Sequence, residues 1–404
     1  MIANNLLEKI TTSGYCTGCG LCASVAEPNQ IKMKINASGF LRPVIQHAIS
    51  VESDAAIKHL CPGIHLEHAA QVQNKHPIWG PLVNVRTGFA QDAEIQHLGS
   101  SGGVISALAV YLLESGKVDF VAQTAVSKTA PLVNVLQKSF TREDVLHAAG
   151  SRYAPSSPLE NIRELFQSGQ TFAFIGKPCD VAGLQAYIAK NPQYKHQIKY
   201  MISFMCAGVP SIHGSKEVIA KMGADINQLV SFRYRGDGWP GKARAVQADG
   251  QSFEMDYNSS WGNILGKQIQ FRCKLCADGT GEFADIVCAD AWYGKDGYPD
   301  FAEREGRSLL LTRTEAGEHL INEAIHAASI QVSPLDVGEI SKMQPYQVNR
   351  KKVVLGRVLA AGLAHRYFIQ YKNMGLVVAS LATDPVTWFR HAWGTFKRVK
   401  GEVQ

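Results

Sequence analysis

The chain has 404 residues, of which 46% are hydrophobic and 19% charged. This composition is typical of a folded protein of two or three domains and argues against extended disorder. The net charge is only +6 and no long basic run is interleaved with aromatic residues, so we expect no nucleic-acid partner.

The N-terminal residues, Met1 to Asn5, lack the basic segment and apolar core of a signal peptide. The longest apolar run, near Met374 to Ala382, is too short to cross a bilayer, so we expect no transmembrane segment. These features predict a cytoplasmic protein. Because thiols stay reduced in the cytoplasm, the nine cysteines indicate metal binding or catalysis rather than disulfides.

Residues 1–80 form the first of three expected regions, a ferredoxin-like iron–sulfur region with little regular periodicity. Three cysteines spaced by two residues lie in its glycine-rich loop: Cys16, Cys19 and Cys22. This spacing lets thiolates converge on one cubane cluster. The ferredoxin pattern continues with Cys-Pro after three residues, where this chain has Ala26. Cys61, followed by Pro62, is therefore predicted as the fourth ligand; the alternative is a buried structural thiol.

Residues 81–345 form the second expected region, with an α/β pattern. A small-residue turn at 99–103, Gly-Ser-Ser-Gly-Gly, precedes an apolar helical run at 104–113. The amides and dipole of a helix N-terminus favour phosphate, and glycine permits close approach. The alternative is a plain helix cap. The turn is not a Walker A loop, because no Gly-Lys-Ser/Thr follows it.

Further along, a strand at 172–177, a helix at 180–189, a strand at 198–205 and a helix at 215–222 predict a parallel strand pair with a crossover. Two cysteines each follow one of these strands: Cys179 and Cys206. Since neighbouring parallel strands end side by side, both thiols are expected to face one site.

Two strands of a more antiparallel part are expected at 229–235 and 243–248, before a second C-x2-C pair, Cys273 and Cys276. With Cys179 and Cys206 this pair makes a second set of four thiols, suited to [4Fe–4S] or to zinc. The ninth cysteine, Cys288, lies in an apolar strand-like run and is predicted to be a buried structural residue.

A strand at 307–313 and a helix at 315–328 complete the α/β pattern. The third expected region, residues 346–404, is helical and carries ten Lys and Arg residues. Three interpretations stay open for it: a solvated helical cap, a docking surface for an acidic partner, or a membrane face.

An ordered set of motifs resembles the coenzyme F420 hydrogenase/dehydrogenase beta-subunit family. The matching segments are Cys-Thr-Gly-Cys-Gly-Leu-Cys at 16–22, Ser-Gly-Gly at 101–103, Gly-Ser-Arg-Tyr at 150–153, Gly-Lys-Pro-Cys-Asp at 176–180, Arg-Tyr-Arg-Gly-Asp-Gly-Trp at 233–239, Arg-Cys-Lys-Leu-Cys-Ala-Asp at 272–278, Ala-Asp-Ile at 284–286, Asp-Ala-Trp at 290–292 and Glu-Gly-Arg-Ser at 305–308. The stretches at 272–278 and 290–293 look more like bacterial members associated with polysaccharide gene clusters than like the chlorophyll reductases. The long basic tail departs from the short hydrogenase subunits of the family.

The resemblance implies an iron–sulfur reductase that contains FAD, with residues 81–345 as the FAD-binding domain. The residues that it implies near FAD are Ser101, Gly102, Gly103, Ser151, Arg152 and Tyr153. Members pass electrons between clusters, a flavin and either the deazaflavin F420 or another acceptor.

We therefore expect an α/β (α+β) fold: a small N-terminal iron–sulfur segment, a central mixed-sheet flavin domain and a helical C-terminal tail. The expected cofactors are two [4Fe–4S] clusters and FAD, with a ferredoxin-like electron donor and a small-molecule acceptor. Two other functions are possible: an electron-transfer subunit of a larger complex with no substrate of its own, or a zinc-stabilised binding module. The chain can also form an oligomer.

Overall fold

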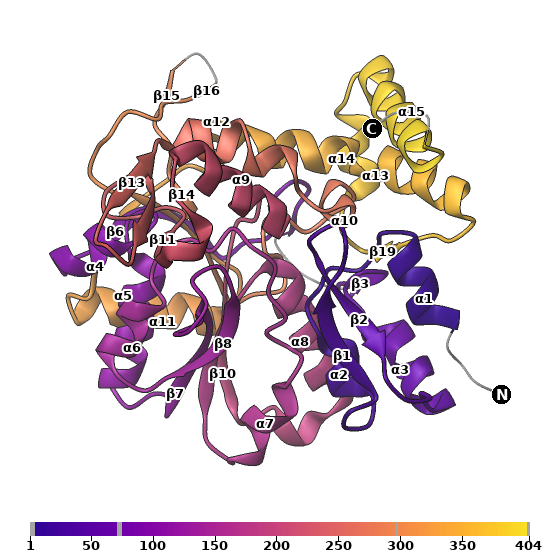
Figure 1. The fold of residues 1–404 in the computed structure, drawn as a ribbon, viewed down its shortest axis with the longest axis horizontal. Helices are drawn as coiled ribbons and strands as arrows, with labels where there is room; N and C mark the ends of the chain where they lie inside the picture. Colours follow the sequence, from indigo (N-terminus) through magenta and orange to yellow (C-terminus); the bar gives the residue numbers. More distant parts are fainter. Residues whose placement is uncertain (1–4, 71–74, 296–297, 402–404) are drawn as a thin grey trace.

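In the computed structural model, which describes residues 5–70, 75–295 and 298–401, the central element is an eight-stranded mixed sheet (Figure 1). Its strands, in spatial order, are β18 (Ile330–Pro334), β6 (Asn84–Ala90), β17 (Ser308–Thr312), β14 (Ile286–Asp290), β10 (Ile198–Phe204), β9 (Phe172–Gly176), β7 (Phe120–Val126) and β8 (Asn134–Ser139). The four strands β14, β10, β9 and β7 are mutually parallel, and the strands on either side of them pair antiparallel with their neighbours.

Alternate residues of these strands enter two hydrophobic cores. In β9, Phe172 and Phe174 face one core, while Ala173 and Ile175 face the other. Because both faces of β9 are covered, this strand is apolar throughout, as in buried parallel sheets. Helices α5 (Val104–Glu114), α6 (Arg142–His147) and α11 (Glu315–His326) pack on one face, and α7 (Ile162–Gln167) and α8 (Pro178–Lys190) on the other.

The expected α/β fold is confirmed, and β9, α8, β10 and α9 (Ile212–Met222) follow the predicted order with β9 and β10 parallel. The predicted antiparallel part is a separate three-stranded sheet of β11 (Leu229–Arg233), β12 (Ala243–Gln247) and β13 (Ser252–Met255). It has a small core of its own, shared with α9.

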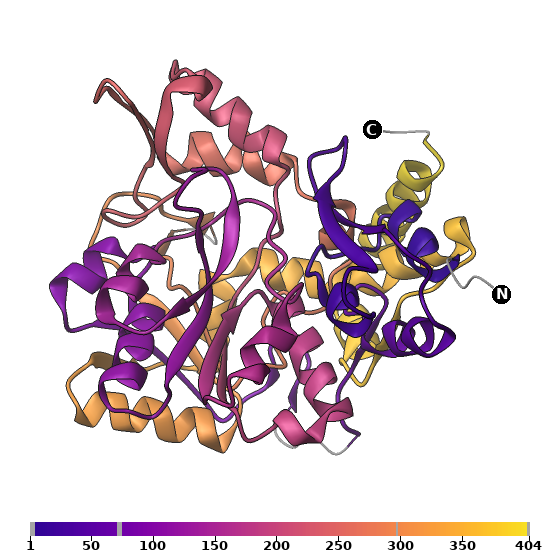
Figure 2. The same cartoon turned by 60° about the horizontal axis from the view of Figure 1, so that its bottom comes forward.

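The N-terminal region has more regular structure than its sequence suggested. Its elements are α1 (Asn5–Thr12), α2 (Leu21–Val25), a hairpin of β1 (Ile31–Ile35) and β2 (Leu41–Ile45), α3 (Val51–Leu60) and β3 (His65–Glu67), while β4 (Lys75–His76) pairs with β5 (Gly80–Pro81). These elements lie beside α8 in both views (Figures 1 and 2). Leu7 and Ile57 share a hydrophobic core with Leu184 of α8.

The C-terminal region is helical, as predicted. Two short helices, α10 (Phe271–Lys274) and α12 (Ile340–Met343), precede it in the chain. Its own helices are α13 (Pro345–His365), α14 (Leu376–Leu381) and α15 (Pro385–Val399). Between α13 and α14, β19 (Gln370–Lys372) pairs in parallel with β3 of the N-terminal region. The remaining short strands, β15 (Gly294–Lys295) and β16 (Tyr298–Pro299), pair with each other. Within the described residues, no helix has the length and apolar character needed to cross a membrane.

Candidate functional site

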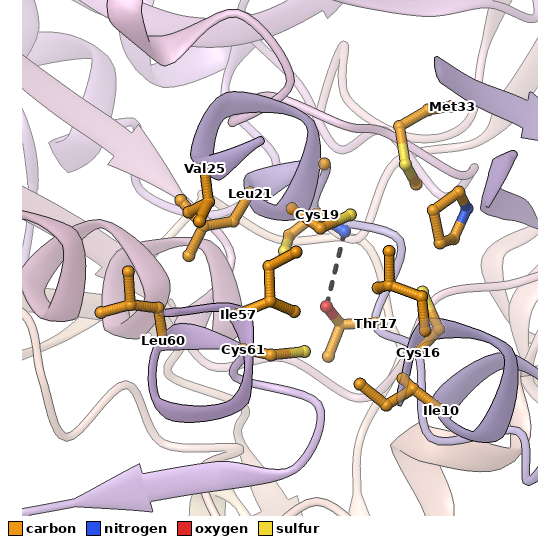
Figure 3. A pocket seen from close by; sticks show the side chains of 14 residues that line it. Ile10, Cys16, Thr17, Cys19, Leu21, Val25, Met33, Ile57, Leu60 and Cys61 are labelled. Carbon is orange, nitrogen blue, oxygen red and sulfur yellow. Dashed lines mark hydrogen bonds between the residues drawn. The ribbon is translucent and has the colours of Figure 1, made fainter. Parts of the chain in front are cut away.

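Four cysteines of the N-terminal region line one pocket (Figure 3): Cys16, Cys19, Cys22 and Cys61. Apart from Thr17 and Gly20, the other lining residues are apolar. The cavity among these side chains is small, about 20 Å³. The donor set is therefore sulfur alone within an apolar wall, which fits an iron–sulfur cluster or zinc.

Glycines shape the loop that carries the first three thiols. Gly18 and Gly20 have φ of 80° and 86°, in the left-handed region that favours glycine. A Cβ at Gly20 would lie 2.7 Å from the backbone nitrogen of Glu160, so a side chain is excluded there. Cys61 ends α3, and a Cβ at Gly63 would lie 2.5 Å from the carbonyl oxygen of Tyr15. The backbone just after Cys61 therefore lies close to the residue that precedes Cys16.

Burial raises the pKa of these thiols, to about 12 for Cys19 and Cys61. The pKa of Cys22 lies well above its ordinary value, because burial and the nearby Cys16 both disfavour the thiolate. The Gly18 N–H donates to Cys16 Sγ at 3.4 Å. The pocket therefore holds neutral thiols near pH 7, and they become thiolates when a bound cation displaces their protons.

A second group of three cysteines surrounds the end of β10. Cys206 follows that strand, Cys273 lies in α10 and Cys276 just beyond it. The Cys206 N–H donates to the carbonyl of Gly279 at 2.9 Å, which ties the strand end to the segment after Cys276. Burial, followed by the nearby Cys273 and Cys276, raises the pKa of Cys206 to about 12.

Cys179, in the first turn of α8, lies between the two groups. Burial raises its pKa well above the ordinary value, and Asp180, Cys19 and Cys206 add to the effect. Cys179 thus lies near Cys206 and also near a thiol of the first set. Among the described residues, no group of three or more His, Cys, Asp or Glu side chains is arranged so that it could hold a metal ion.

The Arg272 side chain connects the two cysteine groups. It precedes Cys273 in sequence and is only 2% exposed. Its Nε donates to the carbonyl of Gly63 and its Nη2 to that of Pro62, both at 2.8 Å. Its guanidinium lies 5.5 Å from the ring centroid of Tyr371. Arg272 therefore places a buried positive charge beside the turn of Cys61 and next to the second group.

The predicted phosphate turn packs tightly against the sheet. Gly103 has φ of 74° and precedes α5, and Ser101 Oγ lies 2.8 Å from Ser308 Oγ. The Gly102 N–H donates to Ser308 Oγ at 2.9 Å, and a Cβ at Gly102 would lie 2.6 Å from the carbonyl oxygen of Gly88. Glycine at 102 is therefore required by the protein's own backbone. Ser100 Oγ is buried without a hydrogen-bond partner in the described part of the chain, so it can serve a ligand.

The second predicted flavin segment, Ser151 to Tyr153, lies near the first. Arg233 joins them, since it donates to the carbonyl of Leu98 and lies 3.3 Å from a Cβ built on Gly150. Arg152 donates to Asn134 Oδ1 at 2.8 Å and to the carbonyls of Phe232 and Pro131 at 3.0 and 2.9 Å. With these donors in use, Arg152 holds the loop in place. The ring of Tyr153 packs on that of Trp261, with the two ring centroids 4.6 Å apart.

Two family models match the chain, and both describe the beta subunit of coenzyme F420 hydrogenase/dehydrogenase. Residues 85–163 match the model of its N-terminal part, and residues 169–337 match the model of its C terminus. Together they cover more than half of the chain. The chain belongs to the coenzyme F420 hydrogenase/dehydrogenase beta-subunit family. Cys179, Cys206, Cys273 and Cys276 lie within the matched segments, whereas the first cysteine set and helices α13 to α15 lie outside them.

Several proteins are similar to this chain. It is 28% identical over 364 residues to the coenzyme F420-dependent sulfite reductase of Methanocaldococcus jannaschii, with 86% of this chain and 51% of that protein covered. It thus spans about half the length of that relative. It is 26% identical to the coenzyme F420 hydrogenase subunit beta of Methanococcus voltae, over 69% of this chain and 98% of that one. These relatives support its assignment to the oxidoreductases.

A solved structure shares the fold of this family member. A chain of the F420-reducing [NiFe] hydrogenase complex from Methanosarcina barkeri superposes with a TM-score of 0.55 at 18% identity, covering 73% of this chain and 98% of that one. The likeness confirms the α/β fold.

The structure also joins two family motifs whose pairing the sequence did not reveal. Arg235, 1% exposed, donates to both carboxylate oxygens of Asp290, at 2.9 and 2.6 Å, and Trp239 Nε1 donates to the same carboxylate at 2.7 Å. The guanidinium lies 4.7 Å from the ring centroid of Tyr257 and 5.1 Å from that of Trp292. A buried ion pair in an aromatic cluster results. In the sequence, the only sign of this ion pair was that one family motif contains an Arg and another contains an Asp.

Proposed function

We propose that this chain is an iron–sulfur flavoprotein oxidoreductase that passes electrons from a ferredoxin-like donor, through two [4Fe–4S] clusters and FAD, to an organic acceptor, F420 or another small molecule. The observation that carries the proposal is the apolar pocket lined by four cysteines, with a second cysteine group joined to it through Arg272. Clusters carry single electrons, and a flavin takes up two and can deliver them as hydride.

The order of the groups in space supports this electron path. Arg272 connects the turn of Cys61 to the second group. At the start of α13, Gln347 Nε2 donates to the carbonyl of Cys206 at 3.2 Å, and Gln344 Nε2 donates to that of Asp290 at 2.7 Å. One short helical segment therefore links the second cysteine group to the aromatic cluster near the proposed flavin residues.

In this proposal, Cys16, Cys19, Cys22 and Cys61 hold one cluster, and Cys179, Cys206, Cys273 and Cys276 hold the other. Ser101 to Gly103 and Ser151 to Tyr153 lie near FAD, with Ser100 Oγ as a free donor. We also propose the division into residues 1–80, 81–345 and 346–404. A cytoplasmic location agrees with the use of reduced thiols.

A second candidate is an electron-transfer subunit of a larger complex with no substrate of its own. It is favoured by the relatives, since the matched proteins of Methanococcus voltae and Methanosarcina mazei are named as subunits of an F420 hydrogenase and an F420H2 dehydrogenase. Robust turnover of a soluble acceptor by the isolated chain would exclude it. A zinc-stabilised binding module is a third candidate, which colour and metal analysis separate, because zinc–thiolate sites are colourless.

Purification without oxygen, followed by spectroscopy and flavin analysis, tests the proposal. We expect a brown protein that releases FAD on denaturation. Ser100→Val should lower bound FAD, because it removes an unpaired donor from the turn. Ser115→Ala is the matched control, since Ser115 Oγ donates within its own helix to the Tyr111 carbonyl. A protein without flavin, or a Ser100→Val variant with full FAD, would contradict the flavin assignment.

A further inference from the structure

The C-terminal helices expose an unusual amount of apolar surface. Nineteen large hydrophobic side chains are strongly exposed among the described residues, and nine of them lie between positions 359 and 393. The nine are Leu359, Leu363, Phe368, Val377, Val378, Leu381, Val386, Phe389 and Trp393. Leu381 is 81% exposed and Val386 73%. Such a concentration marks an interaction surface rather than scattered exposure.

The same region is strongly basic. Residues 346–404 contain ten Lys and Arg residues but only two acidic ones, Asp384 and Glu402. Two of the basic residues, Arg350 and Lys351, are buried beside the second cysteine group. Four others are exposed on or beside the helices: Arg366, Arg390, Arg398 and Lys400. Lys372 of β19 is also exposed and pairs with Glu67. The outside of these helices is therefore positive as well as apolar.

Helix α15 carries both properties on its outer face. Its inner face packs on α13, since Trp388 lies 2.8 Å from a Cβ built on Gly356. On its outer face Phe389 and Trp393 stack with ring centroids 6.5 Å apart, and Lys397 Nζ lies 5.5 Å from the centroid of Trp393. Helices that lie in the headgroup layer of a membrane combine Trp and Phe with flanking Lys and Arg in this way.

An apolar groove of about 320 Å³ lies between α13 and α14. Among its lining residues, Leu359, Phe368, Val377 and Val378 belong to the exposed apolar set. A groove of this size, lined almost wholly by hydrocarbon, suits an aliphatic chain rather than a polar ligand. In both views α15 lies at the periphery, away from β7 and β8 (Figures 1 and 2), so a flat surface can reach it.

We propose that α14, α15 and the end of α13 form a docking surface for a bilayer that contains anionic phospholipid. The apolar side chains enter the headgroup boundary, and the basic residues contact the lipid phosphates. A second copy of the chain would bring two basic surfaces together, which charge repulsion opposes. An acidic protein would match the charge but not the apolar groove. The proposal does not depend on the clusters or on FAD.

Co-sedimentation of the full-length protein with vesicles tests the proposal. One set of vesicles contains phosphatidylcholine alone and the other contains phosphatidylglycerol as well. We expect binding to be about tenfold stronger with phosphatidylglycerol at low salt, and to weaken as salt is added. Phe389→Glu/Trp393→Glu should abolish binding, and Arg390→Glu/Lys397→Glu should remove the preference for phosphatidylglycerol.

Two control variants make the same changes elsewhere. Val230→Glu alters an exposed hydrophobic residue of β11, and Lys221→Glu an exposed basic residue of α9; both should bind like the wild type. Unchanged circular dichroism shows that all four variants are folded. The proposal is overturned if vesicles of neither composition bind the wild type. It is also overturned if Phe389→Glu/Trp393→Glu leaves vesicle binding intact but splits a dimer, or if it abolishes only binding to a ferredoxin.

Discussion

Replacement of Arg272 by methionine should destabilise the protein strongly. The side chain is 2% exposed, and it donates to the carbonyls of Gly63 and Pro62 at 2.8 Å each. Methionine fills much of the same volume but leaves both buried carbonyls without a partner. Each orphaned acceptor costs about 1–3 kcal/mol, so we expect a loss of about 2–6 kcal/mol in the free energy of unfolding. The turn of Cys61 should loosen with it, and iron bound there should be lost.

Urea unfolding of anaerobically purified protein, with iron content measured in parallel, checks this prediction. Arg272→Lys keeps the charge but cannot donate to two carbonyls in the fixed planar geometry of arginine, so an intermediate loss is expected. Arg304→Met is the matched control, because the Arg304 side chain is 46% exposed and its ion pair with Asp300 lies at the surface. It should change stability by less than about 1 kcal/mol. Wild-type stability and full iron content in Arg272→Met would refute the role given to this residue.

Three further predictions concern Glu282, Cys288 and Cys179. Burial opposes the charge of Glu282, but Lys351 lowers its pKa from 4.5 to about 2, so the stability from this pair is complete above about pH 4.5 and is lost as the pH falls toward 2. Glu282→Gln should therefore lose about 3 kcal/mol by urea unfolding at neutral pH and clearly less at about pH 3; an equal loss at both would contradict the assignment. Cys288→Ser should leave the iron content unchanged, whereas Cys276→Ser should lose a cluster. The reason is that burial raises the pKa of Cys288 with no contribution from a neighbouring thiol. The reverse result would move Cys288 into the ligand set. Cys179→Ser should lose only the second cluster, measured as about half of the iron, and retention of all iron would remove it from both sets.

Patterns confined to short segments predicted the fold well. The apolar run at 172–177 became β9, and the parallel pairing with β10 followed from the order of strand and helix. That pairing also placed Cys179 and Cys206 at one edge of the sheet. The hairpin of β1 and β2 was missed, although the alternation of lysine with apolar residues at Ile31–Ile35 is typical of a strand. The run has only five residues, and its partner β2 contains Pro43, which weakens the signal.

Contacts between distant segments could not be predicted. The position of Cys179 near Cys19 depends on how the N-terminal loop packs on α8, which no local pattern encodes. The constraint at Gly102 comes from the Gly88 carbonyl in β6, so a side chain there would disturb the backbone as well as any ligand. For this reason Ser100, whose hydroxyl is unpaired among the described residues, is a better probe of flavin binding.

Iron and acid-labile sulfide per chain, measured in the wild type and in two single variants, test the central claim most directly. The account predicts about eight iron atoms in the anaerobically purified wild type, as two cubane clusters require. It predicts about four in Cys16→Ser and about four in Cys276→Ser, because each variant loses one ligand of a separate set. Stoichiometric zinc without iron, or an unchanged iron content in both variants, would contradict it.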